Sequence, residues 1–240
     1  MRRLILILAM LCATLGAFAY TDSFTSLTHD PAFLALLDVV KNGGTEAEAQ
    51  VAYEAYIATE PSMLDASRAN YHMVRYYMDK GDETKAREHL ALQEEYFIQM
   101  PPTVSDLEKR VTEADLTSSE YYITGSMGTG MDNSKLTKEL YKDYPEEYYV
   151  AIQEAFRLIY TPHIAGGSSK RAIKLLDEIA TDLDGISTPD YYSFLTAQGI
   201  GHSKDKKWAE SETYFDQAAQ IYTFDPAIPE FREKNRKGLD

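Results

Sequence analysis

Apolar residues recur every three or four positions through almost the whole chain, and this spacing constrains the fold more than any other feature. Phe33, Leu36, Leu37 and Val40, for example, fall on one face of a helix. The stretches with this spacing end at glycine or proline, the residues that commonly terminate helices. No segment shows the sustained alternation of apolar and polar residues that a half-buried β-strand needs. The sequence therefore predicts an all-α protein.

The breaks between the apolar stretches predict where helices end. Gly81 ends a helix expected over residues 63–80. Further along, we expect helices over residues 104–126 and 134–143, on either side of a glycine-rich break. The glycines of that break are Gly125, Gly128 and Gly130.

The helices also recur at a regular distance, which is typical of helical repeats. Ala49, Tyr53, Tyr56 and Pro61 take the Ala, aromatic, small-residue and Pro positions of a 34-residue unit that begins at Asp30. Further units are expected to begin near Ser67, Gln153 and Tyr192, with a degenerate one near Ala114.

On these residues the chain resembles the tetratricopeptide-repeat family, from Asp30 to Pro226. The full Trp-x2-Leu-Gly-x2-Tyr signature of that family is absent. The resemblance implies a right-handed solenoid of four to five antiparallel helix pairs, in which stacked neighbours bury each other's apolar faces. The alternative is an irregular α-helical bundle. The expected organisation is a signal peptide at 1–19, a short lead at 20–29, helix pairs at 30–100, a degenerate pair or insertion at 101–152, helix pairs at 153–226 and a C-terminal capping helix or tail at 227–240.

The first residues have the pattern of an export signal. Arg2 and Arg3 precede an apolar run of about ten residues, and Ala17-Phe18-Ala19 supplies the small residues of an A-x-A cleavage site. We expect cleavage after Ala19, so that the mature protein begins at Tyr20 in a bacterial periplasm. Secretion, or retention of the apolar run as an anchor, are the alternatives. No other stretch approaches the 18 apolar residues of a membrane span.

Charge and cysteine content exclude several classes of function. The formal net charge is -14, and it becomes -16 when residues 1–19 are removed. Nucleic acids and anionic membrane surfaces repel so acidic a chain. The only cysteine, Cys12, lies within the predicted signal peptide and follows Leu11 rather than the small residue of a lipoprotein signal. The mature protein is therefore expected to have no disulfide, thiolate nucleophile or cysteine-based metal site.

No motif of catalysis or cofactor binding is present. The chain lacks H-E-x-x-H, G-x-S-x-G and G-x-x-x-x-G-K-[ST], and no two of its five histidines share a helix face. We therefore predict no catalytic residue, no metal site and no cofactor.

A short loop, Gly166-Gly167-Ser168-Ser169, precedes two basic residues and invites two interpretations. A turn between helices needs a glycine with positive φ and a serine at the N-cap. The alternative is a small-anion site at the start of the following helix.

The family resemblance also indicates a binding surface. In tetratricopeptide repeats, positions 2, 5, 9 and 12 of the first helix of each unit line the concave groove. These positions hold Arg68, Tyr71, Arg75 and Met78 in the second unit, and Glu154, Arg157, Thr161 and Ile164 in the third. Arginine offers a planar pair of donors to carboxylates, so the implied ligand is an acidic segment or a peptide carboxylate. The alternative is that these arginines pair with neighbouring Glu and Asp.

Together these features predict an exported, non-catalytic scaffold or adaptor that binds a protein or peptide partner. One alternative is a transport-accessory protein similar to the T component of tripartite ATP-independent periplasmic transporters, although the chain lacks the lipoprotein signal expected there. A second alternative is an enzyme that uses acidic helix faces or the Gly166-Gly167 loop.

Overall fold

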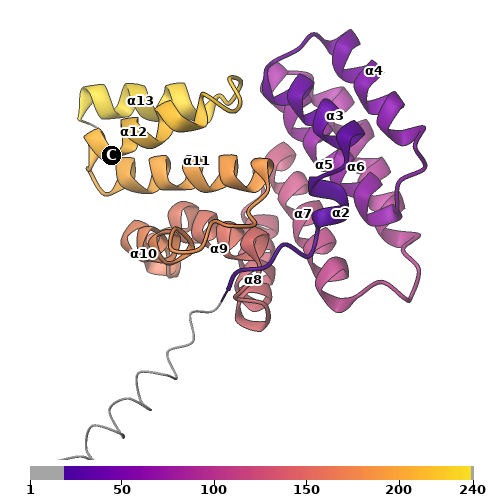
Figure 1. The fold of residues 1–240 in the computed structure, drawn as a ribbon. Coiled ribbons are helices and arrows are strands. Elements are labelled where there is room, and N and C mark those ends of the chain that lie inside the picture. Colours follow the sequence, from indigo (N-terminus) through magenta and orange to yellow (C-terminus); the bar gives the residue numbers. More distant parts are fainter. Residues whose placement is uncertain (1–18, 239–240) are drawn as a thin grey trace, which may run out of the picture.

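The chain folds into α-helices joined by short loops, as a computed structural model describes for residues 19–238 (Figure 1). Except for Ala19, the predicted signal peptide lies outside the described residues. The only β-type pairing in the described part is an isolated bridge between Thr21 and Glu147. The all-α prediction is therefore confirmed. The helices are α2 (Thr25–Thr28), α3 (Pro31–Lys41), α4 (Glu46–Ile57), α5 (Met63–Lys80), α6 (Glu83–Ile98), α7 (Asp106–Thr124), α8 (Met127–Asp143), α9 (Tyr148–Tyr160), the 3-10 helix η1 (His163–Ala165), α10 (Ser169–Ile179), α11 (Thr188–Lys204), α12 (Trp208–Ala218) and α13 (Ala227–Lys237).

Local sequence signals explain where most of these helices begin and end. Ser62 accepts a hydrogen bond from the backbone of Asp65 and starts α5, and Gly81 ends it in the left-handed conformation, with φ of 81°. The bounds of α5 are the ones that the sequence predicts. Thr45 and Glu48 form a reciprocal capping box at the start of α4.

The predicted glycine-rich break in the middle of the chain is wrong in its extent. Gly125 ends α7 with φ of 61°, but Ser126 immediately caps α8, which begins at Met127 rather than at residue 134. Gly128 and Gly130 therefore lie inside a helix. A Cβ atom at Gly130 would lie 2.8 Å from the ring of Tyr121, so the missing side chain lets α7 and α8 approach closely.

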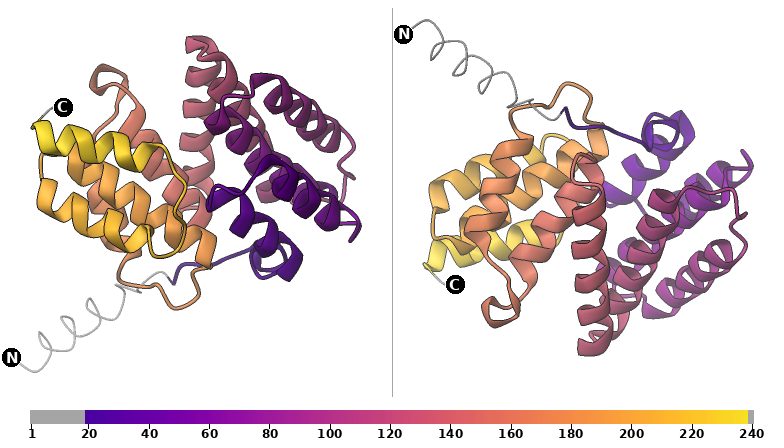
Figure 2. Two further views of the ribbon diagram at one scale, coloured as in Figure 1. Left: turned by 90° about the horizontal axis from the view of Figure 1, so that it is seen from above. Right: turned by 90° about the horizontal axis from the view of Figure 1, so that it is seen from below.

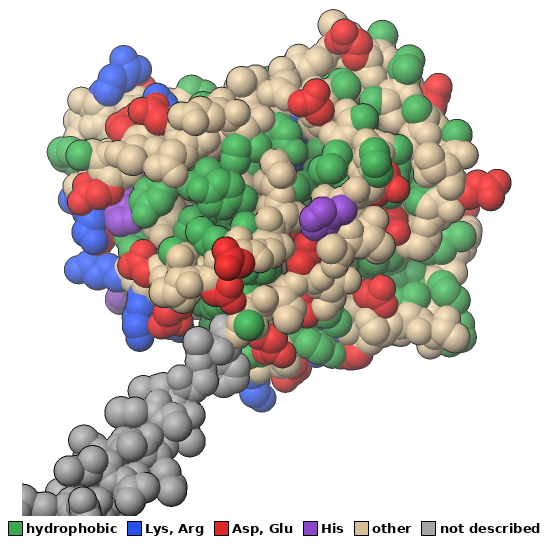
Figure 3. Space-filling model, viewed as in Figure 1, with side chains coloured by type: hydrophobic (Ala, Val, Ile, Leu, Met, Phe, Trp, Pro, Cys, Tyr) green, Lys and Arg blue, Asp and Glu red, His purple; other side chains and the backbone are tan. Residues whose placement is uncertain are grey.

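The helices form two groups that meet where α7 packs against α8. Figures 1 and 2 show α2 to α7, here called the first lobe, on one side, and α8 to α13, the second lobe, on the other. Most consecutive helices pack together in both lobes, and α9 also packs against α11. One cluster of buried apolar side chains runs through both lobes. Hydrophobic side chains also gather over α11 on the face drawn in Figure 3.

Two contacts far apart in sequence join the lobes. The loop after α12 meets the end of α3, where the backbone N–H of Phe224 donates to the carbonyl of Lys41 over 2.8 Å. Beside it, the Asn42 side chain accepts two hydrogen bonds from Thr223. On the other side of the molecule, the strand-like segment at Thr21 exchanges backbone hydrogen bonds with residues 146 and 148. The lobes are therefore held in a fixed relation around the space between them.

No helix within residues 19–238 combines the length and the apolar character that crossing a membrane requires.

Candidate functional site

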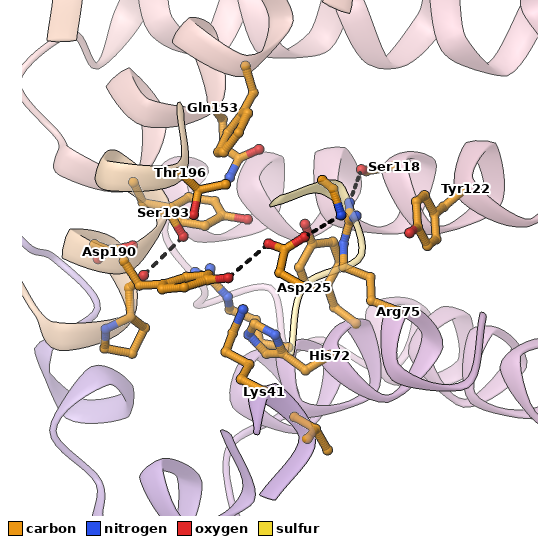
Figure 4. A pocket seen from close by; sticks show the side chains of 18 of the residues that line it. Lys41, His72, Arg75, Ser118, Tyr122, Gln153, Asp190, Ser193, Thr196 and Asp225 are labelled. Carbon is orange, nitrogen blue, oxygen red and sulfur yellow. Dashed lines mark hydrogen bonds between the residues drawn. The ribbon is translucent and has the colours of Figure 1, made fainter. Parts of the chain in front are cut away.

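A cavity of about 420 Å³ lies between the two lobes. Its walls come from α3, α5 and α7 of the first lobe, from α8, α9 and α11 of the second, and from the loop before α13 (Figure 4). This volume falls in the range of small-molecule binding sites, about 300–1,000 Å³. Aromatic rings make up much of the wall, namely Tyr71, Tyr122, Tyr149, Phe156, Tyr160 and Tyr192.

Two of the three arginines that the sequence placed in a groove are neutralised by carboxylates. Arg68 is buried, and its Nε lies 3.5 Å from the carboxylate of Asp115. Its guanidinium carbon also lies 3.9 Å from the centre of the Tyr149 ring. Arg157 donates two hydrogen bonds of 2.6 and 2.7 Å to Glu154. Both arginines line the cavity, and each has a carboxylate partner, as the alternative interpretation of the sequence predicts. Nε and Nη1 of Arg68 nevertheless have no hydrogen-bond partner.

Arg75 differs because no carboxylate of the described chain lies within ion-pair distance of it. Its guanidinium lies between the rings of Tyr71 and Tyr122, at 4.6 and 4.8 Å from their centres. One terminal nitrogen donates to Ser118 over 2.9 Å. The buried Nε has no hydrogen-bond partner. Arg75 thus retains a buried Nε–H donor that nothing in residues 19–238 satisfies.

Lys41 is a second cation of this kind, and sequence reasoning missed it. Its Nζ lies 4.9 Å from the centre of the Tyr192 ring and 5.6 Å from that of Tyr222, with no carboxylate within ion-pair distance in the described part. Burial lowers the pKa of Lys41, and Asp225 partly opposes that effect. In the sequence Lys41 is an ordinary basic residue in the last turn of a helix. Only the return of the loop after α12 places it in a cavity.

The pKa of His72 depends on the cations around it. Burial lowers its pKa well below the ordinary value, and Lys41, Arg68 and Arg75 lower it further. His72 is therefore neutral at pH 7. Three cations acting on one buried imidazole indicate a positive potential on this side of the cavity.

The carboxylates of the cavity already accept hydrogen bonds. Asp225 accepts from the hydroxyl of Tyr192 and from the backbone of Ala227, both over 2.9 Å. Asp79 accepts from the Tyr122 hydroxyl over 2.6 Å. Lys41 and Arg75 therefore line the cavity with no carboxylate of residues 19–238 within ion-pair distance, and a ligand that supplies acceptors fits the site.

The opposite wall carries polar groups without charge. Figure 4 shows Gln153 of α9 and Ser193 and Thr196 of α11 on this side of the cavity. Ser193 donates to the carbonyl of Pro189. Thr196 is only 4% exposed, and its hydroxyl has no partner. A buried hydroxyl without a partner is costly unless a ligand or an ordered water satisfies it.

The structure brings together four of the six residues predicted to line a groove, namely Arg68, Tyr71, Arg75 and Arg157. Met78 and Thr161 do not line the cavity. Met78 packs against the apolar core instead. Thr161 follows the last residue of α9. The reason is that α9 ends at Tyr160, one turn earlier than a continuous groove-lining helix would require.

The loop at residues 166–169 forms a compact turn. Gly166 has φ of 93°, and Gly167 approaches the carbonyl of Thr161 so closely that a Cβ has no room. Ser168 caps α10 by accepting from the backbone of Arg171, and Ser169 is the first residue of that helix. Each of these features serves the connection between helices.

A comparison of the chain with protein-family models, curated proteins and solved structures gives no match. Within residues 19–238 no three His, Cys, Asp or Glu side chains cluster as metal ligands would. The geometry of the cavity therefore carries the functional argument.

Proposed function

We propose that this protein binds an organic carboxylate in the cavity between its lobes. The observation that carries the proposal is the pair of cations, Lys41 and Arg75, which line an aromatic-walled cavity with no carboxylate of residues 19–238 within ion-pair distance. The carboxylate belongs either to a free organic acid or to the C-terminus of a peptide. Both sources present the same group to the site.

The walls suggest how such a ligand lies. The carboxylate receives hydrogen bonds from Arg75, whose planar guanidinium suits its geometry, and from Lys41. An apolar or aromatic body packs against the tyrosine rings. A hydroxyl or amide at the far end of the ligand reaches Thr196, whose hydroxyl has no other partner.

This proposal keeps the non-catalytic binding role that the sequence suggests and narrows its ligand. An exported protein of tetratricopeptide-like architecture that captures the end of a peptide in the periplasm remains the first biological setting we propose. The cavity has a volume of about 420 Å³, which also suits a small solute, whereas a protein segment needs an extended groove. That observation favours a role in handling a transported acid, as in the T component of tripartite ATP-independent transporters, as the second candidate.

The test is binding of defined carboxylates to the chain that starts at Tyr20. Suitable probes are phenylacetate, benzoate and a tripeptide with a C-terminal phenylalanine, each measured by calorimetry beside its neutral amide. We expect the acids to bind and the amides to fail, because only the acids satisfy Lys41 and Arg75. Binding of phenylacetate but not of the tripeptide would identify a free organic acid as the ligand, and the reverse result would identify a peptide C-terminus.

Variants of the two cations complete the test. Lys41→Met and Arg75→Met should each weaken binding about tenfold to a hundredfold, as loss of a buried charged partner does. Lys174→Met is the matched control, because the Lys174 side chain is 80% exposed on α10 and outside the cavity. Equal binding of acids and amides, or an equal effect of all three variants, would reject the proposal.

A further inference from the structure

The first described residues are fixed against the second lobe by specific hydrogen bonds. The backbone N–H of Tyr20 donates to a carboxylate oxygen of Asp182, in the loop between α10 and α11, over 2.9 Å. The Tyr20 ring stacks on Tyr148, with 5.3 Å between ring centres. The hydroxyl of Tyr148 in turn donates to the carbonyl of Asp182 over 2.6 Å. Tyr20 is thus placed by its backbone and its side chain together.

The residues that follow are held as closely. Thr21 pairs with the backbone of residues 146 and 148, and its hydroxyl donates to Glu147 over 2.8 Å. Ser23 donates to the same carboxylate from its backbone and its hydroxyl, over 3.1 and 2.5 Å. Glu147 is buried, with 6% of its surface exposed. The chain therefore has a defined path from Tyr20 onward (Figure 2).

The described residues around Tyr20 are acidic. Burial raises the pKa of the Tyr20 phenol, and Tyr141, Glu178, Tyr148 and Asp182 raise it further. Within residues 19–238 no basic side chain lies within ion-pair distance of Asp182 or Glu147. A positive charge at the nitrogen of Tyr20 would meet a carboxylate that has no other ion-pair partner.

We propose that proteolytic cleavage between Ala19 and Tyr20 supplies this charge, and that the new α-ammonium group of Tyr20 pairs with Asp182 in the mature protein. Water adds to the Ala19 carbonyl, the peptide bond breaks, Ala19 leaves with a carboxylate and Tyr20 keeps the nitrogen. The nitrogen then takes up a proton, because the ordinary pKa of an α-amine, about 7.7–8.0, lies above neutral pH. An amide N–H offers Asp182 one donor, whereas the ammonium offers three donors and a charge.

Two independent observations meet at this bond. The sequence places small residues at both positions of an A-x-A cleavage site that ends at Ala19. The structure places a carboxylate 2.9 Å from the atom that the cleavage would convert into a cation. The proposal does not depend on what the cavity binds.

The test compares four chains whose sequences begin at Tyr20: the wild type and the Asp182→Asn variant, each with a free and with an acetylated N-terminus. Acetylation restores the amide and removes the charge without altering any side chain. We expect the free chain to melt about 2–4 °C above the acetylated chain at pH 6.5, the shift that about 1 kcal/mol produces in a domain of this size. In the Asp182→Asn background, acetylation should have no such effect.

The pH dependence follows from the same pair. Asp182 favours the charged amine, so the stabilisation is present below the ordinary pKa of the amine and is lost as the pH rises through the higher pKa of the folded state. The difference between free and acetylated chains should therefore vanish by about pH 10. N-terminal sequencing of the protein exported with its own leader should read Tyr20 first. A different first residue, or equal melting of free and acetylated chains at pH 6.5, overturns the proposal.

Discussion

Lys41 of α3 lies over the ring of Tyr192 of α11, with 4.9 Å between Nζ and the ring centre, so that a cation of one lobe rests on an aromatic face of the other. No carboxylate of residues 19–238 lies within ion-pair distance of this lysine. Its burial therefore lowers the stability of the ligand-free protein, as the lowered pKa indicates. A site that is complete only with its ligand has such an unfavourable free energy in the ligand-free state.

The Lys41→Met variant should therefore be more stable than the wild type when no ligand is present, by about 1–2 kcal/mol. Methionine keeps the length and the apolar stem but removes the charge. Urea unfolding of both proteins measures the difference, with Lys174→Met as the exposed control. A loss of stability would mean that the ammonium group has a partner that holds the fold together.

The buried pair of Arg68 and Asp115 should behave in the opposite way. Replacing Arg68 with Met leaves the Asp115 carboxylate buried without its cation, and such a change costs about 3–5 kcal/mol. Replacing Arg87 with Met breaks an exposed pair with Glu83 and should change the free energy of unfolding by less than about 1 kcal/mol. Comparable effects of the two variants in urea unfolding would show that the Arg68 pair is solvated.

Asp190 should make stability depend on pH below neutrality. Burial, aided by Asp22 and Asp115 and opposed by Arg68 and Ser187, raises the pKa of Asp190 to about 6. The unfolded chain releases this proton near its ordinary pKa of about 3.9. Between those values the folded protein holds a proton that the unfolded chain has lost, so the free energy of unfolding decreases as the pH rises from about 4 to 6.

The Asp190→Asn variant isolates this contribution because it keeps the shape of the side chain and does not titrate. The wild type should lose about 2 kcal/mol relative to the variant between pH 4 and pH 6, and less than about 0.5 kcal/mol more up to pH 8. Urea titrations at four pH values measure the difference. A difference that stays constant with pH would place Asp190 in contact with solvent.

Gly199 of α11 should not tolerate even a methyl group. A Cβ atom there would overlap the ring of Phe215, which is fully buried where α12 crosses α11. Overpacking of this kind costs about 1–3 kcal/mol, more than the gain of about 1 kcal/mol from a better helix former. Gly185→Ala is the matched control, because no atom lies within 4 Å of its Cβ position. Equal melting temperatures for the two variants would contradict the close crossing.

Much of the helical architecture was predictable because local signals decide it. Ser62 and Gly81 mark both ends of α5, and the apolar spacing of Phe33, Leu36 and Val40 identifies the buried face of α3. The error at α8 has a local cause as well. Ser126 caps the helix so soon after Gly125 that the following glycines are carried into it, with Gly130 packed beneath Tyr121.

The site was less predictable because long-range contacts form it. The repeat positions implied by the tetratricopeptide resemblance predict that Arg68, Arg75 and Arg157 share a surface, and all three line the cavity. Whether an arginine is free or paired depends on Asp115 of another helix, which no local pattern reveals. Lys41 and Asp225 lie far apart in sequence. They line the same cavity only because the loop after α12 returns to the end of α3.

The hydrogen bonds from Thr223 to Asn42 bridge 181 positions of sequence and close the chain into a ring of helices. An open array of repeats can be shortened at its ends and can fray there, because each unit touches only its neighbours. A closed ring loses that freedom, since removing the last helices also uncovers the first. We therefore expect truncation before residue 223 to abolish a single cooperative melting transition, and native hydrogen exchange to show α3 and α12 opening together.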